Sequence, residues 1–358
     1  MARPAPKTKK ARTNWYAEVT ATIVAELERL KDNPAAWEKP WDGLWKFGLP
    51  MRSNGEPFTG INVWLLALAA QDQGFVDPRW YTFNQAMEAV GGYKKDGRWW
   101  NWAGEGDDPK HGVRKGSHGS AAVRVHRTPI YVVSSTGSRV WPPRRTAKKA
   151  EREAWKRRLA SGEVVQQGAY TSIQSYRVFN AEQIDGLPQM ATKDIDPAAK
   201  YAQAEALVDI LGVDVRHLSG CDTAAYVRSQ DAVVMPEAGQ FKTVEDYLST
   251  KMHEVIHWTG APKRLNRDKG LQGTEEYAYE ELVAEIGSAF LCAHLGIEGK
   301  LQHPEYLAAW IKRLQGDEKA IIRAASQASK AVDFILAGGQ ATTKTDDTAT
   351  GPAATRAA

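Results

Sequence analysis

Apolar residues along the first part of the chain recur mostly at helical spacing. Over residues 14–31 they return every three or four positions, which predicts an amphipathic helix that ends before Pro34. A strongly apolar run over residues 60–75 predicts a second helix, stopped at Gly74. A third, shorter helix is predicted within residues 82–92, because a threonine can cap its start and a Gly-Gly pair can end it.

The pattern then changes to the alternation that is typical of strands. Residues 120–134 are rich in β-branched side chains and predict a strand that is broken near Pro129. A second strand is predicted over residues 169–180. Between the two strands, residues 140–163 are highly charged and have little apolar surface to bury, so they predict a solvent-exposed loop or a helical insertion.

From about residue 195 the chain becomes mainly helical. Residues 196–212 predict a helix, and residues 224–236 predict a pair of strands around a turn at Ser229 and Gln230. Three further helical segments follow, over residues 249–260, 275–296 and 318–337. The chain is therefore expected to have an α+β fold, with an α+β N-terminal domain followed by a mainly helical domain that contains a small sheet.

These changes in pattern divide the chain into two domains with polar ends. Residues 1–12 are basic, contain proline and lack an apolar period, so they predict a disordered arm. Residues 338–358 are rich in Gly, Thr and Ala and predict a disordered tail. The two domains are expected over residues 13–180 and 199–337, joined by a linker over residues 181–198.

Composition narrows the class of protein only in part. The chain has 358 residues, of which 42% are hydrophobic, and this is enough for two folded domains. Its net charge of +4 permits a nucleic-acid partner without requiring one. Cys221 and Cys292 are far apart and form no Cys-x-x-Cys pair, which favours a reducing cytoplasm. There is no apolar run long enough for a bilayer and no secretory signal, so we expect no membrane partner.

The segment STKMHEVIHWTG, residues 249–260, holds two histidines four positions apart with a glutamate directly after the first. On a helix, His253 and His257 lie on one face and can bind one ion together, while Glu254 lies beside that ion. Zinc hydrolases need this arrangement, because two neutral imidazoles hold the metal and a carboxylate accepts a proton from water. The alternative is a half-buried helix whose two histidines are simply hydrogen-bonded.

The third ligand decides the class of zinc site. Lys263 occupies the position where an extended motif places a third histidine, so a glutamate on a following helix is the other route. Glu281 and Glu285 lie one turn apart in an apolar segment, where carboxylates are costly unless they are paired or bind a metal. The spacing resembles the Glu-x-x-x-Asp pattern of thermolysin-like gluzincins, with Glu281 as ligand and Glu285 orienting a ligand histidine. An ordinary salt-bridged turn is the alternative for this pair.

Other residues of this half suggest further roles. Gly287 and Ser288 are small and would let another helix approach closely. Three tyrosines are candidates for stabilising the oxyanion of a tetrahedral intermediate, and the sequence does not choose among Tyr226, Tyr277 and Tyr279.

Aromatic and basic residues are interleaved in the N-terminal half. This combination binds single-stranded nucleic acid, since bases stack on aromatic faces and cations follow the phosphates. The candidates for this contact are Arg79, Trp80, Lys94, Lys95, Arg98, Trp99, Trp100, Arg114, Lys115 and Arg124. The alternative is that Trp80 and one or more of the other tryptophans belong to the core and that the lysines are only solvated.

In their order along the chain, these motifs resemble the ArdC-type antirestriction proteins of conjugative plasmids and phages, whose N-terminal domain also occurs in TraC-type plasmid primases. The matching stretches cover most of the chain and include PFTGINVWLL (57–66), PRWYTFNQAMEAVGG (78–92), VRKGSHGSAAVRV (113–125), HEVIHWTG (253–260), RLNR (264–267) and YAYEELVAEIGSAFLCAHLGI (277–297). Residues 93–112 and 136–168 are longer than the family pattern.

The resemblance implies an N-terminal single-stranded DNA-binding domain and a C-terminal zincin-like metallopeptidase domain. It also implies that His253, His257 and Glu281 bind Zn²⁺ and that Glu254 is the catalytic base. The sequence therefore predicts a cytoplasmic antirestriction protein that binds incoming single-stranded DNA and has a zinc peptidase of gluzincin type. Two other hypotheses stay open: a DNA-coating protein with a structural zinc and no peptidase activity, and a protease that acts on host restriction or regulatory proteins.

Overall fold

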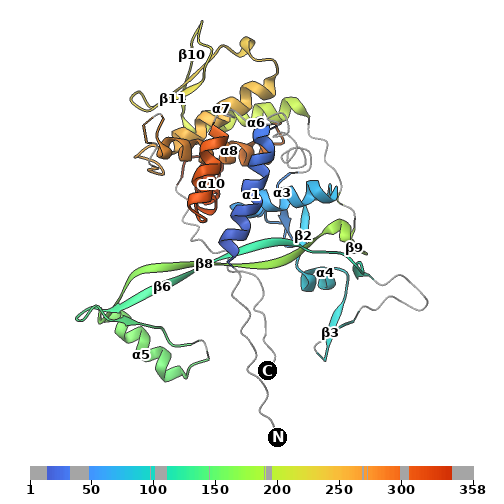
Figure 1. Cartoon of the computed structure of the whole chain (residues 1–358), viewed down its shortest axis with the longest axis vertical. Helices are drawn as coiled ribbons and strands as arrows, with labels where there is room; N and C mark the ends of the chain where they lie inside the picture. The colour runs from blue at the N-terminus through green and yellow to red at the C-terminus, as the bar shows by residue number, and fades with distance from the viewer. Residues whose placement is uncertain are drawn as a thin grey trace. The chain divides into compact units, whose positions relative to one another are not determined.

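The computed structural model describes residues 14–32, 48–96, 98–100, 111–144, 146–188, 190, 196–267, 270–271, 273–298 and 306–340. The chain forms two compact units (Figure 1). The first contains the described residues up to Ala122 and from Arg177 onward, and the second contains Val123–Tyr176. The predicted arm over residues 1–12 and most of the predicted tail lie outside the described residues. The domain boundaries and the linker stay predictions.

Three helices predicted for the N-terminal half are confirmed. They are α1 (Trp15–Asp32), α3 (Ile61–Gln73) and α4 (Phe83–Ala89). Gly74 ends α3 with a φ of 72°, the left-handed conformation that glycine adopts without strain. Thr82 caps α4 by accepting a hydrogen bond from the backbone N–H of Gln85, whose side chain in turn accepts from the backbone N–H of Thr82.

A five-stranded sheet has the strand order β1-β2-β8-β6-β7. Its strands are β1 (Met51–Arg52), β2 (Arg79–Tyr81), β6 (Ser120–Val133), β7 (Arg139–Val140) and β8 (Val164–Asn180). The predicted break near Pro129 is wrong, since β6 continues through it. Proline removes one donor, and β6 pairs with β7 only at Tyr131 and Val132, so position 129 lies outside that ladder.

Two small antiparallel strand pairs belong to the same half. β3 (Tyr93–Lys95) pairs antiparallel with β4 (Arg98–Trp100), and β5 (Gly112–Val113) pairs antiparallel with β9 (Ile184–Asp185). Neither pair was predicted, because strands of two or three residues are too short to show an alternating pattern.

The second unit contains the outer parts of β6 and β8 together with β7 and α5 (Lys149–Ala160). The charged segment that predicted a loop or helical insertion forms α5, and none of the residues of this helix is buried. Trp155 of α5 packs its ring edge-on against Tyr131 of β6, with ring centroids 5.2 Å apart.

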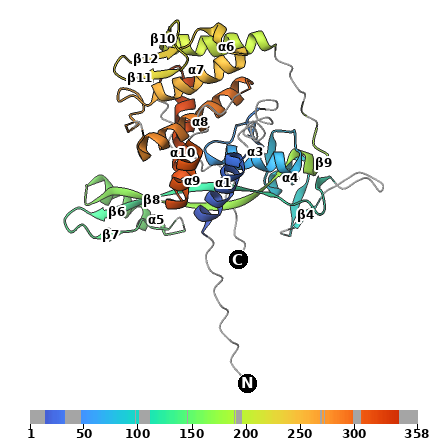
Figure 2. The same cartoon turned by 45° about the horizontal axis from the view of Figure 1, so that its top comes forward.

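The C-terminal half begins with α6 (Pro197–Leu211), which is followed by a three-stranded sheet of order β10-β12-β11 (Figure 2). Its strands are β10 (Asp214–His217), β11 (Ala225–Val227) and β12 (Ala232–Met235). β11 and β12 are antiparallel, which confirms the predicted strand pair. β10 was not predicted because its sequence, DVRH, is mostly polar and exposed.

Four helices complete the fold. They are α7 (Val244–Thr259), α8 (Glu275–Leu295), α9 (Leu307–Gly316) and α10 (Ala320–Leu336), of which α9 was not predicted. The close approach of α7 and α8 that the small residues predict is confirmed. A Cβ on Gly287 would lie 3.0 Å from the side chain of Ile256, and the Ser288 hydroxyl donates to the carbonyl of Ser249 over 3.2 Å. Mixed helices and sheets confirm the predicted α+β class.

Candidate metal centre and nucleic-acid interface

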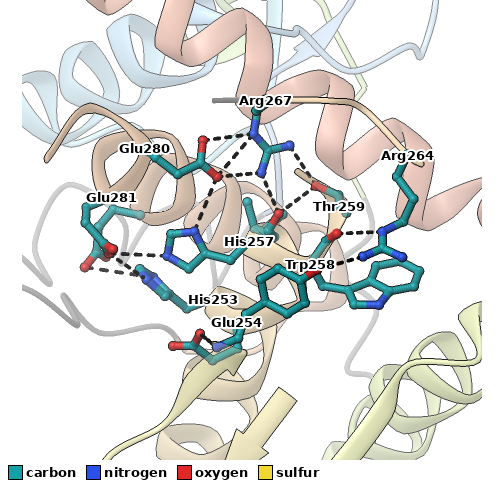
Figure 3. A network of polar contacts seen from close by, with 12 residues as sticks. His253, Glu254, His257, Trp258, Thr259, Arg264, Arg267, Glu280 and Glu281 are labelled. Carbon is teal, nitrogen blue, oxygen red and sulfur yellow. Dashed lines mark hydrogen bonds and ion pairs between the residues drawn. The ribbon is translucent and has the colours of Figure 1, made fainter. Parts of the chain in front are cut away.

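Helix α7 carries both predicted ligand histidines on one face (Figure 3). Thr243 caps the helix by accepting a hydrogen bond from the backbone N–H of Asp246, so the register of the helix is fixed at its start. His253 and His257 are four positions apart, and their rings are 4.9 Å apart between centroids. Both are buried in the core, His253 completely.

Helix α8 brings Glu281 to these two rings. The Oε2 atom of Glu281 lies 3.3 Å from His253 Nε2 and 3.3 Å from His257 Nε2. The ligand atoms of the three residues all lie within 4.8 Å of one another, and all three side chains are buried. Two imidazole nitrogens and one carboxylate oxygen thus converge on one point, which is a donor set that divalent transition metals prefer.

Burial and close contacts shift the acid–base equilibria of this group. Burial lowers the pKa of His253, because a charged imidazolium is costly away from water. Burial acts to raise the pKa of Glu281, but the hydrogen bonds and charges of His253 and His257 outweigh it and hold that pKa well below its usual range. The group is therefore biased towards a neutral His253 and an ionised Glu281, which are the forms that bind a metal.

Glu280 makes a contact with this group that the sequence analysis did not predict. Its Oε1 atom lies 3.3 Å from His257 Nδ1, on the side of the ring opposite to Glu281. Arg267 donates to Glu280 through Nη2 over 2.8 Å and through Nε over 3.1 Å, and both side chains are buried. The available signal was weak: a second glutamate next to Glu281 and an arginine in the RLNR stretch.

Arg267 also holds the C-terminal end of α7. Its Nη2 donates to the carbonyl of Ile256 over 2.6 Å, and its Nη1 donates to the hydroxyl of Thr259 over 2.8 Å (Figure 3). The carbonyls in the last turn of a helix have no partner within the helix, so this arginine satisfies one of them. One side chain therefore links the end of α7 to the carboxylate behind His257.

Glu285, the predicted orienting carboxylate, lies close to the other histidine. Its Oε1 atom is 4.0 Å from His253 Nδ1, which is longer than a hydrogen bond. Its role in orienting a ligand stays a prediction, while Glu280 has the shorter contact with a ring nitrogen.

Glu254 lies on α7 next to His253 and is held by a backbone group of the neighbouring sheet. The N–H of Tyr226, on β11, donates to Glu254 Oε2 over 2.6 Å. This hydrogen bond fixes the position of the carboxylate through Oε2 and does not involve Oε1.

The three candidate tyrosines occupy different environments. Tyr277 lies on α8 one turn before Glu281, and burial together with the charge and hydrogen bond of Glu281 raises its pKa. The Tyr226 hydroxyl instead donates to Asp231, and Tyr279 lies 3.5 Å from the carbonyl of Ala320. Among the three, only Tyr277 has its hydroxyl beside a predicted metal ligand.

A second polar network supports the turn after α7. Arg264 donates through Nε to the carbonyl of Trp258 over 2.6 Å, and its guanidinium lies 3.8 Å from the centre of the Trp258 ring. It also forms an ion pair with Asp231, in the turn between β11 and β12. Burial and the hydrogen bond to Asp231 raise the pKa of Tyr226 to about 12. The sheet and the end of α7 are thus joined by charged hydrogen bonds.

The predicted DNA contacts differ in how exposed they are, and the prediction that Trp80 contacts DNA needs a correction. Trp80 is only 2% exposed and packs edge-on against Phe75, so its ring has no free face for a base. Arg79 is largely buried and is paired with Asp77 over 2.6 Å, and it also donates to the carbonyl of Pro188. These two residues therefore support the local structure.

The β3–β4 pair brings several candidates together through its backbone. Tyr93 lies opposite Trp100, Lys94 opposite Trp99, and Lys95 opposite Arg98 in the antiparallel register. Trp99 is partly exposed, and its indole N–H donates to the Asn84 side chain of α4 over 2.8 Å. Tyr93 and Phe83 are exposed aromatic residues of the same half.

The remaining basic candidates are exposed to different degrees. Arg114 is exposed but pairs with Asp185 over 3.0 Å and donates to the carbonyl of Glu182. Lys115 lies exposed in the adjacent turn. Arg124 belongs to the second unit, where its guanidinium lies 5.7 Å from the centre of the Tyr176 ring.

Comparison with known families agrees with both halves of this description. The family described as the N-terminal domain of anti-restriction factor ArdC matches residues 13–180, and a zincin-like metallopeptidase family matches residues 202–327. Fold and site thus define a two-domain protein in which an antirestriction N-terminal domain precedes a zincin-like domain. The chain belongs to the ArdC family of antirestriction proteins.

Two crystal structures of the antirestriction protein ArdC from plasmid R388 are similar to this chain. The metal-free structure has a TM-score of 0.65 at 30% identity, and the Mn(II)-bound structure has a TM-score of 0.64 at 31% identity. Each comparison covers 91% of this chain and 98% of the other. A DNA primase TraC of Escherichia coli is 36% identical over 87% of this chain. The matched part spans only 26% of the length of the primase. No helix in the described parts of the chain is long and apolar enough to cross a membrane.

Proposed function

We propose that this protein protects incoming DNA from restriction by binding it as a single strand, and that its zincin-like domain is a metal-dependent peptidase. The observation that carries the proposed peptidase activity is the convergence of His253, His257 and Glu281 beside Glu254. The proposed DNA binding rests on membership of the ArdC family and on the exposed aromatic and basic residues of the N-terminal half of the chain.

The three buried donor atoms fit a divalent cation, because they lie within 4.8 Å of one another and the carboxylate carries one negative charge. Zn²⁺ suits two imidazoles and one carboxylate. A divalent ion held by these atoms supplies a Lewis acid that polarises a scissile carbonyl and lowers the pKa of a water in the site.

The side chains of the chain would divide the remaining work. Glu254, fixed by the Tyr226 N–H, accepts a proton from the attacking water and passes it to the leaving amine. Tyr277 is the candidate for donating a hydrogen bond to the oxyanion, since it lies next to Glu281. Glu280 and Arg267 keep the His257 ring turned towards Glu281.

The small sheet offers a place for an extended peptide. Among the described strands, β11 has only β12 as a neighbour, and the Tyr226 N–H on its other side donates to Glu254. Exposed strand edges bind peptides by adding a strand. A peptide paired with β11 would compete with Glu254 for the Tyr226 N–H and would therefore lie beside the proton acceptor, which favours a peptide substrate.

Cys221 and Cys292 are both free thiols, which agrees with a reducing cytoplasm as the place of action. Single-stranded DNA that enters a cell would be met in this compartment.

Conjugation into restricting and non-restricting recipients tests the proposal. Lys115→Ala should lower both single-stranded DNA affinity and protection, while Glu254→Gln should leave protection largely intact, because coating a strand needs no hydrolysis. Loss of protection in Glu254→Gln with intact DNA binding would replace this proposal with a protease that acts on host restriction or regulatory proteins. Wild-type protein that holds its metal but shows no peptidase activity would favour a structural zinc.

A further inference from the structure

Positive charge is concentrated in the second unit, residues 123–176, which we name the basic arm. Eleven lysines and arginines and three acidic residues lie in this range, a net charge of +8. The whole chain has a net charge of only +4, so the rest of the chain carries a net charge of −4. A surface of one sign attracts polyanions and speeds their association.

The helix of the basic arm directs its cations to solvent. Lys149, Arg152, Lys156 and Arg157 are all exposed, and they lie along one side of α5 at helical spacing. Trp155, which contacts Tyr131 of β6, lies beside the Arg152 edge of this side. The four cations are therefore open to solvent while the helix stays in contact with β6 through Trp155.

Few of the positive charges on α5 are neutralised within the arm. Among the described residues, two ion pairs involve the helix: Lys156 pairs with Glu153 over 3.1 Å and Arg158 with Glu163 over 2.8 Å. Arg152 and Lys156 are like charges four positions apart, an arrangement that destabilises a helix. A bound polyanion would remove this repulsion, whereas a helix that is merely solvated gains nothing from like charges on one face.

Exposed aromatic rings favour single-stranded DNA over duplex. Trp141 is 64% exposed and Tyr170 is 61% exposed. The Arg139 guanidinium lies 5.3 Å from the centre of the Trp141 ring, which places a cation next to a stacking surface. Unpaired bases stack on such rings, while the bases of a duplex are already stacked on each other.

We propose that the basic arm is a second contact surface for single-stranded DNA. Lys149, Arg152, Lys156 and Arg157 contact phosphates, and Trp141 stacks on a base. This inference rests on the proposed DNA binding and extends it to residues that lie outside the N-terminal candidates of the first unit.

The test uses the full chain with Lys149, Arg152, Lys156 and Arg157 all changed to Gln. The control changes four exposed basic residues of the other unit, Arg228, Lys242, Lys312 and Lys330, to Gln, so that both variants lose the same charge. Since no residue of α5 is buried, the arm variant should keep its melting temperature. Affinity for a mixed-sequence single strand and for the matching duplex is measured over a range of salt concentrations.

The salt dependence gives the sharpest expected result. Each phosphate contact contributes about 0.7 to the slope of log K against log salt for single strands, so the arm variant should lose up to about 2.8. Its affinity at about 0.1 M salt should fall by roughly tenfold or more, while the control stays close to wild type. Trp141→Ala should weaken binding without changing the slope, because stacking releases no counterions.

The outcomes separate this inference from the proposed function. A wild-type chain that does not bind single strands would overturn both. Normal wild-type binding with an unchanged arm variant would overturn the inference alone, as would an equal loss in the control variant. A greater loss for the duplex than for the single strand would overturn the assignment of the ligand.

Discussion

The Nδ1 atom of His257 lies 3.3 Å from the Oε1 atom of Glu280, on the side of the ring away from Glu281. A carboxylate in this position fixes both the orientation and the tautomer of an imidazole, so that the other nitrogen faces the metal. Arg267 shares the same carboxylate and offsets the cost of burying it. Metal binding should therefore depend on a residue that is not itself a ligand.

Glu280→Gln should weaken metal binding about 10–100-fold, the usual effect of removing a hydrogen-bonding partner of a ligand. The substitution keeps an acceptor near His257 but removes the charge that pairs with Arg267. The matched control is Glu276→Gln, an exposed position in the first turn of the same helix. Competition with a chromophoric chelator gives the affinities, and equal values for the two variants would exclude a role for Glu280 in holding the ligand.

The ligand assignment itself predicts near-stoichiometric metal in the purified protein. Glu281→Ala should lose most of this metal, because the carboxylate oxygen equidistant from the two imidazoles is removed. Glu285→Ala should lose less, since its carboxylate lies 4.0 Å from His253 Nδ1 and is not in the converging group. Elemental analysis measures both, and metal content in Glu281→Ala equal to wild type would reject the assignment.

Much of this site could be predicted from the sequence because its geometry is local. His253 and His257 need only a helix to meet, and Glu281 lies in an apolar stretch of a helix, where a carboxylate is costly unless it is paired or binds a metal. Glu280 could not be assigned in this way. Its role depends on Arg267, which lies after the turn that follows α7 and donates to Glu280. The geometry of such a turn cannot be predicted from a periodic pattern of apolar residues.

In the N-terminal half, less could be predicted, because the outcome depends on tertiary contacts. A tryptophan in a three-residue strand can face the core or the solvent, and no pattern in such a short element decides which, so the burial of Trp80 could not be predicted. Pro129 misled for a related reason. Whether proline breaks a strand depends on which neighbours the strand has at that position, and pairing partners are set by the tertiary fold.

Glu254→Gln should separate metal binding from catalysis. The amide keeps the shape of the side chain and can still accept a hydrogen bond from the Tyr226 N–H, but it cannot take a proton. We expect unchanged metal content, unchanged DNA affinity and a loss of peptidase activity of about a hundredfold or more. Metal analysis and cleavage of a peptide library measure the two effects, and full activity in the variant would remove Glu254 from the mechanism.

Gly287→Val should destabilise the zincin-like half. A Cβ at this position would lie 3.0 Å from the Ile256 side chain, so α7 and α8 would have to move apart, at a cost of about 1–3 kcal/mol. Gly316→Val is the control, because nothing lies within 4 Å of its Cβ position. Chemical denaturation measures both, and a larger loss in the control would contradict the close packing of the two helices.

The ion pair between Asp231 and Arg264 should make stability depend on pH in the acid range. The hydrogen bond from Arg264 outweighs partial burial and, with Lys263 and Tyr226, holds the pKa of Asp231 well below its usual value. Because this pKa is lower in the folded protein, the carboxylate stabilises the fold at pH values above its unfolded pKa of about 3.9. That contribution is lost as the pH falls from there towards the folded pKa.

Asp231→Asn should therefore be less stable than wild type at neutral pH, and the difference should shrink as the pH falls below about 4. Asparagine suits the test, because Asp231 has a φ of 49° and asparagine tolerates the left-handed conformation. Melting temperatures of both proteins over a series of pH values measure the effect. Asp222→Asn, at an exposed position, controls for the general loss of one acidic group. A stability difference that stays constant down to pH values well below 4 would show that the charge of Asp231 does not stabilise the turn after α7.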